Sequence, residues 1–190
     1  MLDASVNPAS RPLRLEQQGG ILALLADAIH RKDGPVGAHC IHELWMRGDF
    51  SQRIEPALAA LWDAAAPTIP DWLPMNYVEW LPVVYEVAAR FQASGRRGRT
   101  HVYLVLLDYR DSRADPFGIY VGMSRYPAAQ RFDQHKGGIR SAGAVLRRGL
   151  EVLTGPVQHL QGIGRAQAAD IEITLAEALT AAGLFVKGGH

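Results

Sequence analysis

The sequence predicts an α+β fold, in which a mostly helical N-terminal region precedes a small antiparallel three-stranded sheet flanked by helices. Apolar residues recur at helical spacing through most of residues 21–95. After residue 99 this period gives way to runs of β-branched and aromatic residues, which favour strands. A basic segment with two glycines separates the two patterns. We therefore predict a loose polar arm at residues 1–20, a helical region at 21–95 and a second domain at 99–190.

Helices are predicted through the whole helical region. Residues that end helices, such as the run Asp33-Gly34-Pro35 and later Pro67 and Pro70, interrupt the apolar pattern. The predicted helices cover residues 21–32, 39–47, 52–66 and 78–94. All four tryptophans of the chain lie in this region, and a helical core is the simplest use for them. Nothing in the pattern assigns the region a function.

Strands and helices alternate in the second domain. Residues 101–108 and 117–122 predict a hairpin, because the segment between them contains Asp, Arg, Ser and Pro, as turns do. The other predicted elements are helices at residues 127–135, 143–148 and 165–182, a strand at 150–153 and an extended tail. Pro127 suits the first position of its helix, and Gly183 suits the end of the last one.

Composition restricts the classes of protein to which the chain can belong. No apolar run reaches the roughly 18 uncharged residues that a membrane-spanning helix needs, and no apolar stretch follows the first positive charges. The single cysteine, Cys40, excludes an intramolecular disulfide and fits a reducing compartment. We therefore expect a cytoplasmic protein that has no membrane partner.

The two halves of the chain have opposite charge. Residues 1–95 carry 7 Lys and Arg against 11 Asp and Glu, a net charge of −4, whereas residues 96–190 carry 13 against 8, a net charge of +5. A basic domain gains counterion-release energy on a polyanion, and an acidic domain is repelled by it. We expect the second half to bind nucleic acid, with DNA placed ahead of RNA. The helical half is left for a protein partner or for self-association.

The second domain concentrates the side chains that phosphodiester chemistry needs. Arg131 and His135 are four residues apart, so they project from one face of a helix, and arginine is a permanent phosphate ligand. Tyr120 is on a strand, where Gly122 allows a phosphate to approach the backbone. On the neighbouring strand, Tyr103 is a further candidate.

A carboxylate completes the set. Glu172 is on the last predicted helix, where its oxygens suit a hard divalent cation. Together with tyrosine, arginine and histidine, it indicates metal-assisted phosphoryl transfer. Glu177 is the other candidate, but five residues of helix place it on a different face.

These residues resemble the motifs of the GIY-YIG nuclease family, over residues 99–190. The family's second motif, a tyrosine, a branched residue and a glycine, is similar to Tyr120-Val121-Gly122, and its arginine and histidine are similar to Arg131 and His135. The first motif is similar to His101-Val102-Tyr103, with histidine where the family usually has glycine. The hairpin between the two motifs is also longer than is common in the family.

The resemblance implies a metal-dependent endonuclease with a single Mg²⁺ or Mn²⁺. It implies that Tyr103 accepts a proton from the attacking water, helped by the metal or by His135. Arg131 would offset charge on the phosphate, Tyr120 would orient that phosphate, and Glu172 would hold the metal.

The family often has an asparagine beyond the glutamate. The only asparagines in this chain are Asn7 and Asn76, so either Lys187 or His190 replaces it or nothing does. The resemblance and the charge pattern together give a set of expected nucleic-acid contacts. These are Gly122, Arg125, Lys136, Arg140, Arg147, Arg148 and Lys187. The pair Arg147 and Arg148 also fits an ordinary exposed helix end.

Other readings of the sequence stay open. A protein that keeps the nuclease scaffold and its basic face without cutting would bind or regulate nucleic acid. A helical half that binds a protein would make the whole a toxin or a defence component. The cluster His39-Cys40-Ile41-His42-Glu43 contains zinc-ligand residue types, but no second pair of ligands follows at finger spacing. Trp72, Tyr77 and Trp80 suit core packing better than base stacking.

Overall fold

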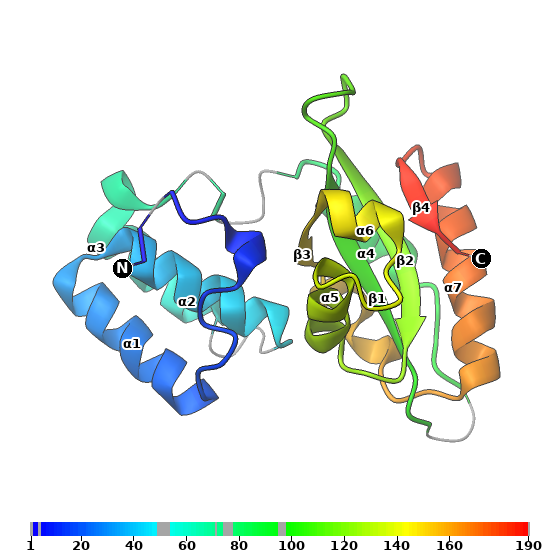
Figure 1. Ribbon diagram of the computed structural model, residues 1–190, viewed down its shortest axis with the longest axis horizontal. Helices are drawn as coiled ribbons and strands as arrows, with labels where there is room; N and C mark the ends of the chain where they lie inside the picture. The colour runs from blue at the N-terminus through cyan, green and yellow to red at the C-terminus, as the bar shows by residue number, and fades with distance from the viewer. Residues whose placement is uncertain are drawn as a thin grey trace. The chain divides into compact units, whose positions relative to one another are not determined.

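The computed structural model describes residues 2–3, 5–48, 54–70, 72–73, 78–94 and 98–189. The chain divides into two compact units, Met1–Tyr77 and Val78–His190, both shown in Figure 1. The first unit is helical, and the second combines helices with a sheet, so the predicted α+β class is confirmed.

The first unit is built from α1 (Gln18–Arg31), α2 (Gly34–Met46) and α3 (Ile54–Ala65), with short 3-10 turns η1 (Pro8–Ser10) and η2 (Ala66–Thr68). Most of α2 is buried, so it forms the centre of the unit. The run that was predicted to end the first helix also starts α2. Asp33 accepts a hydrogen bond from the backbone N–H of Val36 at 3.2 Å, and Pro35 occupies the first turn.

The first twenty residues were predicted as a loose arm, but their described part packs against α2. Arg11 is 3% exposed, and its Nε and Nη2 donate to the two carboxylate oxygens of Glu43 at 3.0 and 2.7 Å. Arg47 donates to the same carboxylate at 2.6 Å. Leu13 is buried in the same core. The prediction failed because it rested on local polarity, and a buried ion pair needs a partner 32 positions away.

The second unit contains a four-stranded mixed sheet with the order β3-β1-β2-β4. Its strands are β1 (His101–Asp108), β2 (Phe117–Ser124), β3 (Gly149–Val152) and β4 (Val186–Gly188). The first three strands are antiparallel, as predicted, but β4 pairs with β2 in the parallel direction. The predicted three-stranded antiparallel sheet therefore needs correction, because the tail forms a further edge strand.

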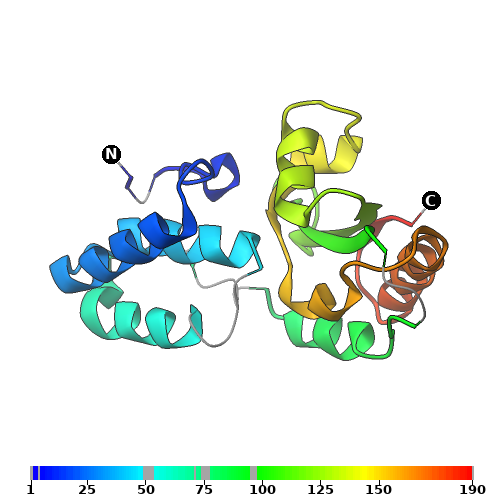
Figure 2. The same ribbon diagram turned by 90° about the horizontal axis from the view of Figure 1, so that it is seen from below.

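Helices cover both faces of this sheet. Figure 2 shows α5 (Ala128–Lys136) and α6 (Gly143–Arg148) on one face. The other face carries α4 (Leu81–Ala88) and η4 (Gly155–Leu160), with α7 (Arg165–Ala181) beside them. Because both faces of the central strand β1 are covered, its residues 102–107 are all buried.

Helix α4 belongs with the sheet. It packs against η4 and α7, and His159 bonds to the carbonyl oxygens of Ala88 and Phe91 at 3.1 and 3.0 Å. The sequence grouped this helix with the helical region 21–95, whereas the two units of the structure divide after Tyr77. Residues 94–100 were interpreted as a linker between domains because they are basic and contain glycine. Such a segment can also join two parts of one domain.

In the described parts of the chain, every helix is too short or too polar to cross a membrane.

Candidate active site

Two tyrosines from neighbouring strands form the centre of the candidate site. In the β1–β2 register Tyr103 lies opposite Gly122, and Tyr120 lies opposite Val105, so both rings project from the sheet face that α5 covers. The ring centroids are 6.0 Å apart. Tyr103 is 1% exposed, while Tyr120 is only partly buried. Tyr120 is therefore the more accessible of the two hydroxyl-bearing rings.

Gly122 makes room for these rings. A Cβ atom at this position would lie 2.7 Å from the ring and hydroxyl of Tyr103 and 2.7 Å from the ring of Tyr120. The sequence assigned Gly122 to close approach of a phosphate to the backbone. In the structure the space over this glycine is occupied by Tyr103, so Gly122 acts by letting the two tyrosines meet.

His135 joins α5 to the tyrosine pair. It is 1% exposed, and its Nε2 lies 2.8 Å from the hydroxyl oxygen of Tyr103. Its other nitrogen, Nδ1, accepts a hydrogen bond of 2.8 Å from the backbone N–H of Ala142. The ring of Tyr120 is 5.9 Å away, at an edge-to-face angle. Both ring nitrogens of His135 are thus in use.

Arg131 is one helical turn before His135 and holds the loop that follows α5. Its Nη1 donates to Gln134 and to the carbonyl oxygen of Ile139, each at 3.1 Å, and its Nη2 donates to the carbonyl oxygen of Arg140 at 2.7 Å. The charge of Arg131 also acts on both tyrosines and on His135. Arg131 therefore lies at the site and supports the loop beside it.

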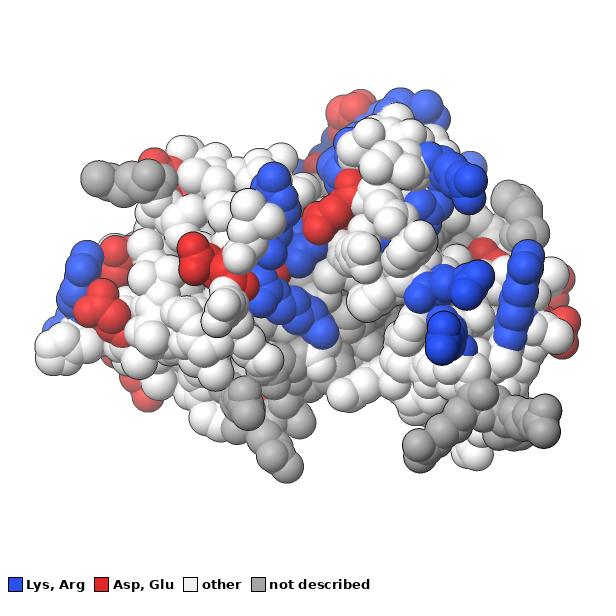
Figure 3. All heavy atoms as spheres, turned by 60° about the horizontal axis from the view of Figure 1, so that its bottom comes forward, with Lys and Arg blue, Asp and Glu red and all other residues white. Residues whose placement is uncertain are grey.

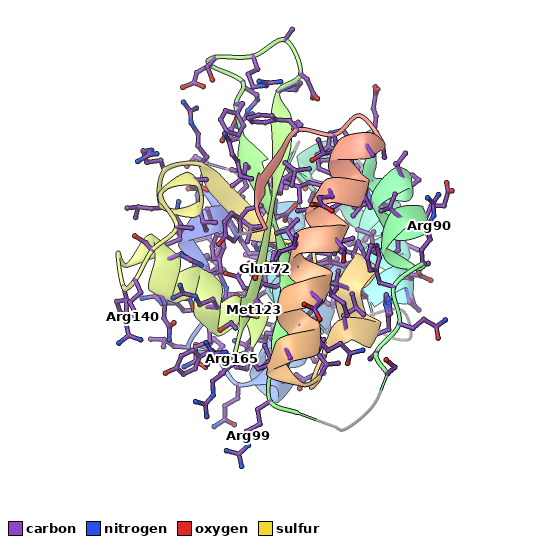
Figure 4. All side chains as sticks on the ribbon, turned by 90° about the vertical axis from the view of Figure 1, so that its right-hand side faces the viewer. Arg90, Arg99, Met123, Arg140, Arg165 and Glu172 are labelled. Carbon is purple, nitrogen blue, oxygen red and sulfur yellow. The ribbon has the colours of Figure 1, made fainter. Side chains whose placement is uncertain are left out.

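Glu172 lies on the side of the site formed by α7. It is 8% exposed, and its charge adds to the effect of burial in raising the pKa of Tyr120. Figure 4 shows Glu172 on α7, the helix that packs against β2. Glu177, the other candidate, is exposed. A buried carboxylate beside a polar cluster is a suitable oxygen ligand for a divalent cation.

A metal at this position would have a sparse protein shell. Among the residues that the structure describes, no group of three or more His, Cys, Asp or Glu is placed to hold an ion. Glu172 would then be one ligand, with water and the substrate supplying the others. Mg²⁺ commonly binds in this way, because it keeps several of its waters.

Burial sets the protonation of the site. Burial raises the pKa of Tyr103 far above its usual range, and Tyr120 raises it further, while Arg131 lowers it. Burial also raises the pKa of Tyr120, against a hydrogen bond from Tyr103 that lowers it. Burial, with a smaller contribution from Arg131, lowers the pKa of His135 to about 4. At neutral pH both tyrosines are protonated and His135 is uncharged.

Two of the predicted nucleic-acid contacts have structural partners instead. The ammonium group of Lys136 donates to the carbonyl oxygens of Leu146 and Gly149 at 3.3 and 3.2 Å, at the end of α6. Arg148 pairs with Asp111 and stacks over the ring of Tyr109 at 5.0 Å. The charged groups of Lys136 and Arg148 therefore bind other groups of the second unit.

Arg148 also lies away from the tyrosine pair. It donates to the carbonyl oxygen of Asp108 at 3.2 Å, at the far end of β1 from Tyr103. Five residues of strand separate these positions, about 17 Å along β1. Arg147 is exposed on α6.

Three arginines lie at the opposite end of the sheet; Arg125 was among the predicted nucleic-acid contacts, whereas Arg99 and Arg165 were not. Thr100 pairs with Ile163 just before α7, which brings Arg99 near Arg165. Arg125 follows Ser124, the partner of His101. All three arginines are exposed. Figure 4 shows Arg99 and Arg165 below Glu172, at the end of the sheet where α7 begins, and Figure 3 shows basic side chains on this unit.

Position in the chain was the available signal for Arg99 and Arg165. Arg99 lies two residues before the first strand, and Arg165 is seven residues, about two helical turns, before Glu172. Both positions flank the expected site in the chain. Because they belong to no motif, their role depends on which ends of β1 and α7 meet, and that is a tertiary property.

The remaining predicted residues lie at the edge of the site or outside the described chain. Lys187 is exposed on β4, where it pairs in register with Tyr120, and its ammonium group is 5.1 Å from the ring of Phe185. His190, the other candidate to replace the family asparagine, falls outside the described residues. The choice of Lys187 as a replacement stays a prediction.

The histidine cluster of the first unit serves packing. His39 and His42 are buried, and their rings lie 4.9 and 5.9 Å from the ring of Trp72. Among the described residues, this cluster too lacks a group of three or more His, Cys, Asp or Glu that could hold a metal ion. Trp72 belongs to the first unit and Trp80 to the second, and Tyr77, which was grouped with them, is outside the described residues.

Comparisons with protein-family models, with curated proteins and with solved structures each found no significant match to this chain. A functional assignment therefore rests on the side chains described above.

Proposed function

We propose that the second unit is a metal-dependent endonuclease of the GIY-YIG type, which hydrolyses phosphodiester bonds in nucleic acid, with DNA as the first substrate to test. The observation that carries the proposal is the convergence of five side chains from four elements. These are Tyr103 on β1, Tyr120 on β2, Arg131 and His135 on α5, and Glu172 on α7. A core needs no such set, because burying each polar group costs free energy.

The sheet supports the proposal in its first three strands. The motif residues lie on the antiparallel pair β1–β2, and β3 completes the three-stranded arrangement that the resemblance implies. The parallel strand β4 extends the edge beyond β2. It carries Lys187 next to Tyr120, so the extra strand adds a basic side chain beside the site.

The side chains divide the chemistry among them. Tyr103 would first lose its hydroxyl proton to solvent, since it is protonated at neutral pH. As the phenolate it would then take a proton from the attacking water as the water oxygen bonds to phosphorus and the bond to the leaving oxygen breaks, and solvent would protonate the leaving oxygen. Tyr120, the more accessible hydroxyl, donates a hydrogen bond to a phosphate oxygen. Arg131 adds positive charge close to both tyrosines, which favours the extra negative charge of the transition state.

Glu172 would hold a single Mg²⁺ or Mn²⁺. The ion, when bound, would act as a Lewis acid on phosphate oxygen and stabilise the leaving group. The carboxylate also stands beside Tyr120, so the phosphate that Tyr120 orients would lie within reach of both.

The proposal is tested by cleavage assays on supercoiled plasmid, single-stranded DNA and RNA, with Mg²⁺, Mn²⁺ or EDTA. We expect divalent-metal-dependent cleavage that falls by on the order of a hundredfold or more in Glu172→Gln and in Arg131→Ala. Glu177→Gln is the matched control, because it makes the same chemical change on an exposed position of the same helix. Its activity should equal that of the wild type.

A second candidate function is a binding protein that keeps this scaffold without cutting. Two observations favour it. Tyr103 is 1% exposed with a raised pKa, and three hydrogen bonds tie the Arg131 guanidinium to its own helix and loop. Tight, salt-sensitive binding of every substrate without cleavage, in any metal, would replace the nuclease by this alternative.

A further inference from the structure

The two nitrogens of His135 have neighbours of different kinds. The neighbour of Nδ1 is the backbone N–H of Ala142, at 2.8 Å, and a backbone N–H can only donate. Nδ1 must therefore be an acceptor without a hydrogen. A neutral imidazole carries one hydrogen, which is then on Nε2, 2.8 Å from the hydroxyl oxygen of Tyr103.

We infer that the backbone N–H of Ala142 fixes His135 as a hydrogen-bond donor to Tyr103, so that His135 stabilises the Tyr103 phenolate and does not remove its proton. The consequence for catalysis rests on the proposed function, but the tautomer itself does not. Ala142 is a positioning residue in this scheme, and it acts through its main chain alone.

The loop around Ala142 is built to hold this N–H in place. Arg131 bonds the carbonyl oxygens of Ile139 and Arg140, and the N–H of Ile139 bonds the carbonyl oxygen of Gln134 at 2.8 Å. On the other side, the carbonyl oxygen of Ala142 accepts from Leu146 at the start of α6. The peptide groups before and after Ala142 are thus anchored to α5 and α6.

The hydrogen bond from His135 to Tyr103 determines what the Tyr103 hydroxyl can do. Because the oxygen of Tyr103 accepts from His135, the hydrogen of that hydroxyl is free to point at another acceptor. The nearest ring on the same face of the sheet is that of Tyr120, with its centroid 6.0 Å from the centroid of Tyr103. Donors therefore run from Ala142 through His135 to Tyr103, and Tyr120 is the more accessible neighbour of this chain.

The resemblance implies that His135 or the metal helps Tyr103 accept a proton from the attacking water, and it leaves open whether His135 does so as a base. A histidine base would need a bare Nε2, and then Nδ1 would carry the hydrogen and face the hydrogen of the Ala142 N–H. Two hydrogens cannot share a 2.8 Å nitrogen pair. The backbone thus excludes the base tautomer at this site.

The first test reads the tautomer directly in the full chain. Long-range ¹H–¹⁵N correlation spectra of protein with ¹⁵N-labelled histidine distinguish Nδ1–H from Nε2–H rings, and the signals lost in His135→Gln assign the residue. We expect a neutral Nε2–H ring at pH 7. A neutral Nδ1–H ring would overturn the inference, whether or not the protein cuts nucleic acid.

The second test removes the donor. Ala142→lactic acid turns the peptide into an ester, which deletes the N–H and adds no atom. We expect the ring of His135 to lose its preference for Nε2–H, whereas Ala142→Gly, which keeps the N–H, should preserve it. An unchanged Nε2–H ring in the ester would show that something other than Ala142 selects the tautomer.

The third test uses the side chain of glutamine, whose amide NH₂ can replace the Nε2–H donor. If His135 donates, His135→Gln should lose cleavage only several-fold, while His135→Ala should lose on the order of a hundredfold. Equal loss in both variants would overturn the donor role. A wild type that shows the Nε2–H ring but cuts nothing would end the proposed function and leave the tautomer assignment intact.

Discussion

At the scale of single residues, the site depends on the absence of a side chain at Gly122. The strand register places this glycine opposite Tyr103, and any side chain would enter the space of the two tyrosine rings. A glycine is used here for the room that it leaves on one face of a sheet. This is a requirement of packing, since its backbone is that of an ordinary strand.

Gly122→Ala should therefore disturb both folding and chemistry. Overpacking by one methyl group costs about 1–3 kcal/mol, and we expect cleavage to fall more than tenfold as the rings separate. Gly118→Ala is the control, because its Cβ would also meet close atoms, at 2.8 Å from the Phe185 ring, away from the tyrosine pair. Urea unfolding and cleavage assays should show similar destabilisation in the two variants, with activity lost only in the first.

His135 should make the stability of the protein depend on pH. Burial lowers its pKa in the folded state to about 4, against about 6.5 in an unfolded chain, so the unfolded state binds more protons between these values. The free energy of unfolding is then highest above pH 6.5 and falls as the pH drops toward 4, by on the order of 3 kcal/mol. Urea unfolding of wild type and His135→Gln, followed by circular dichroism, should show this difference; parallel curves would refute it.

The motif residues could be predicted because the order of residues along a strand and a helix fixes their spacing. Arg131 and His135 share a face of α5, as helical periodicity requires, whereas Tyr103 and Tyr120 share a face of the sheet because of the β1–β2 register. The donor to His135 could not be predicted. It is a backbone N–H, which every residue except proline has, and its position depends on how the loop folds.

At the scale of elements, the hairpin and the last helix match their predicted ranges to within two residues, because long periodic runs identify their own structure. The edge strand β4 was missed. It is three residues long and ends in a glycine with a φ of 90°, so its sequence has no strand signal. It exists because β2 presents an unpaired edge to the end of the chain.

The sequence predicts Lys136 as a nucleic-acid contact, but its ammonium group binds carbonyl oxygens at the end of α6. We expect Lys136→Met to lower the free energy of unfolding by about 1–2 kcal/mol, since two carbonyl oxygens at the end of α6 lose their donor. The salt dependence of nucleic-acid binding should stay as in the wild type. Arg147→Met, an exposed change on α6, is the control for charge. A weaker salt dependence in Lys136→Met would return this lysine to the binding surface.

At the scale of the whole molecule, the excess of positive charge in the second half of the sequence includes a group of exposed arginines at one end of the sheet. Three exposed arginines lie where β1 and α7 begin, Arg99, Arg125 and Arg165. The total charge in the sequence indicated a polyanion as partner. It could not show which arginines face it, because several others are paired within the fold.

The arginine group can be tested by salt titration. Replacing Arg99, Arg125 and Arg165 by alanine should reduce the slope of log Kd against log salt by about 2–3, because each phosphate contact contributes about 0.9 on duplex DNA. A variant with alanine at Arg90, Arg110 and Arg113 has the same net charge and serves as the control. Fluorescence anisotropy at several salt concentrations measures both slopes. Equal slopes would show that charge alone, and not this end of the sheet, determines binding.

The packing of α4 determines at which residue a fragment that contains the second unit should begin. Val84, Val87 and Ala88 are at most 2% exposed, and α4 packs against η4 and α7. A fragment that begins at residue 99, where the motifs begin, would lack α4 and would expose to water the apolar surface of η4 and α7 that α4 covers. A fragment that begins at Val78 would keep it. Anyone who isolates the second unit for crystallisation should therefore choose the longer piece, and should expect the shorter one to aggregate.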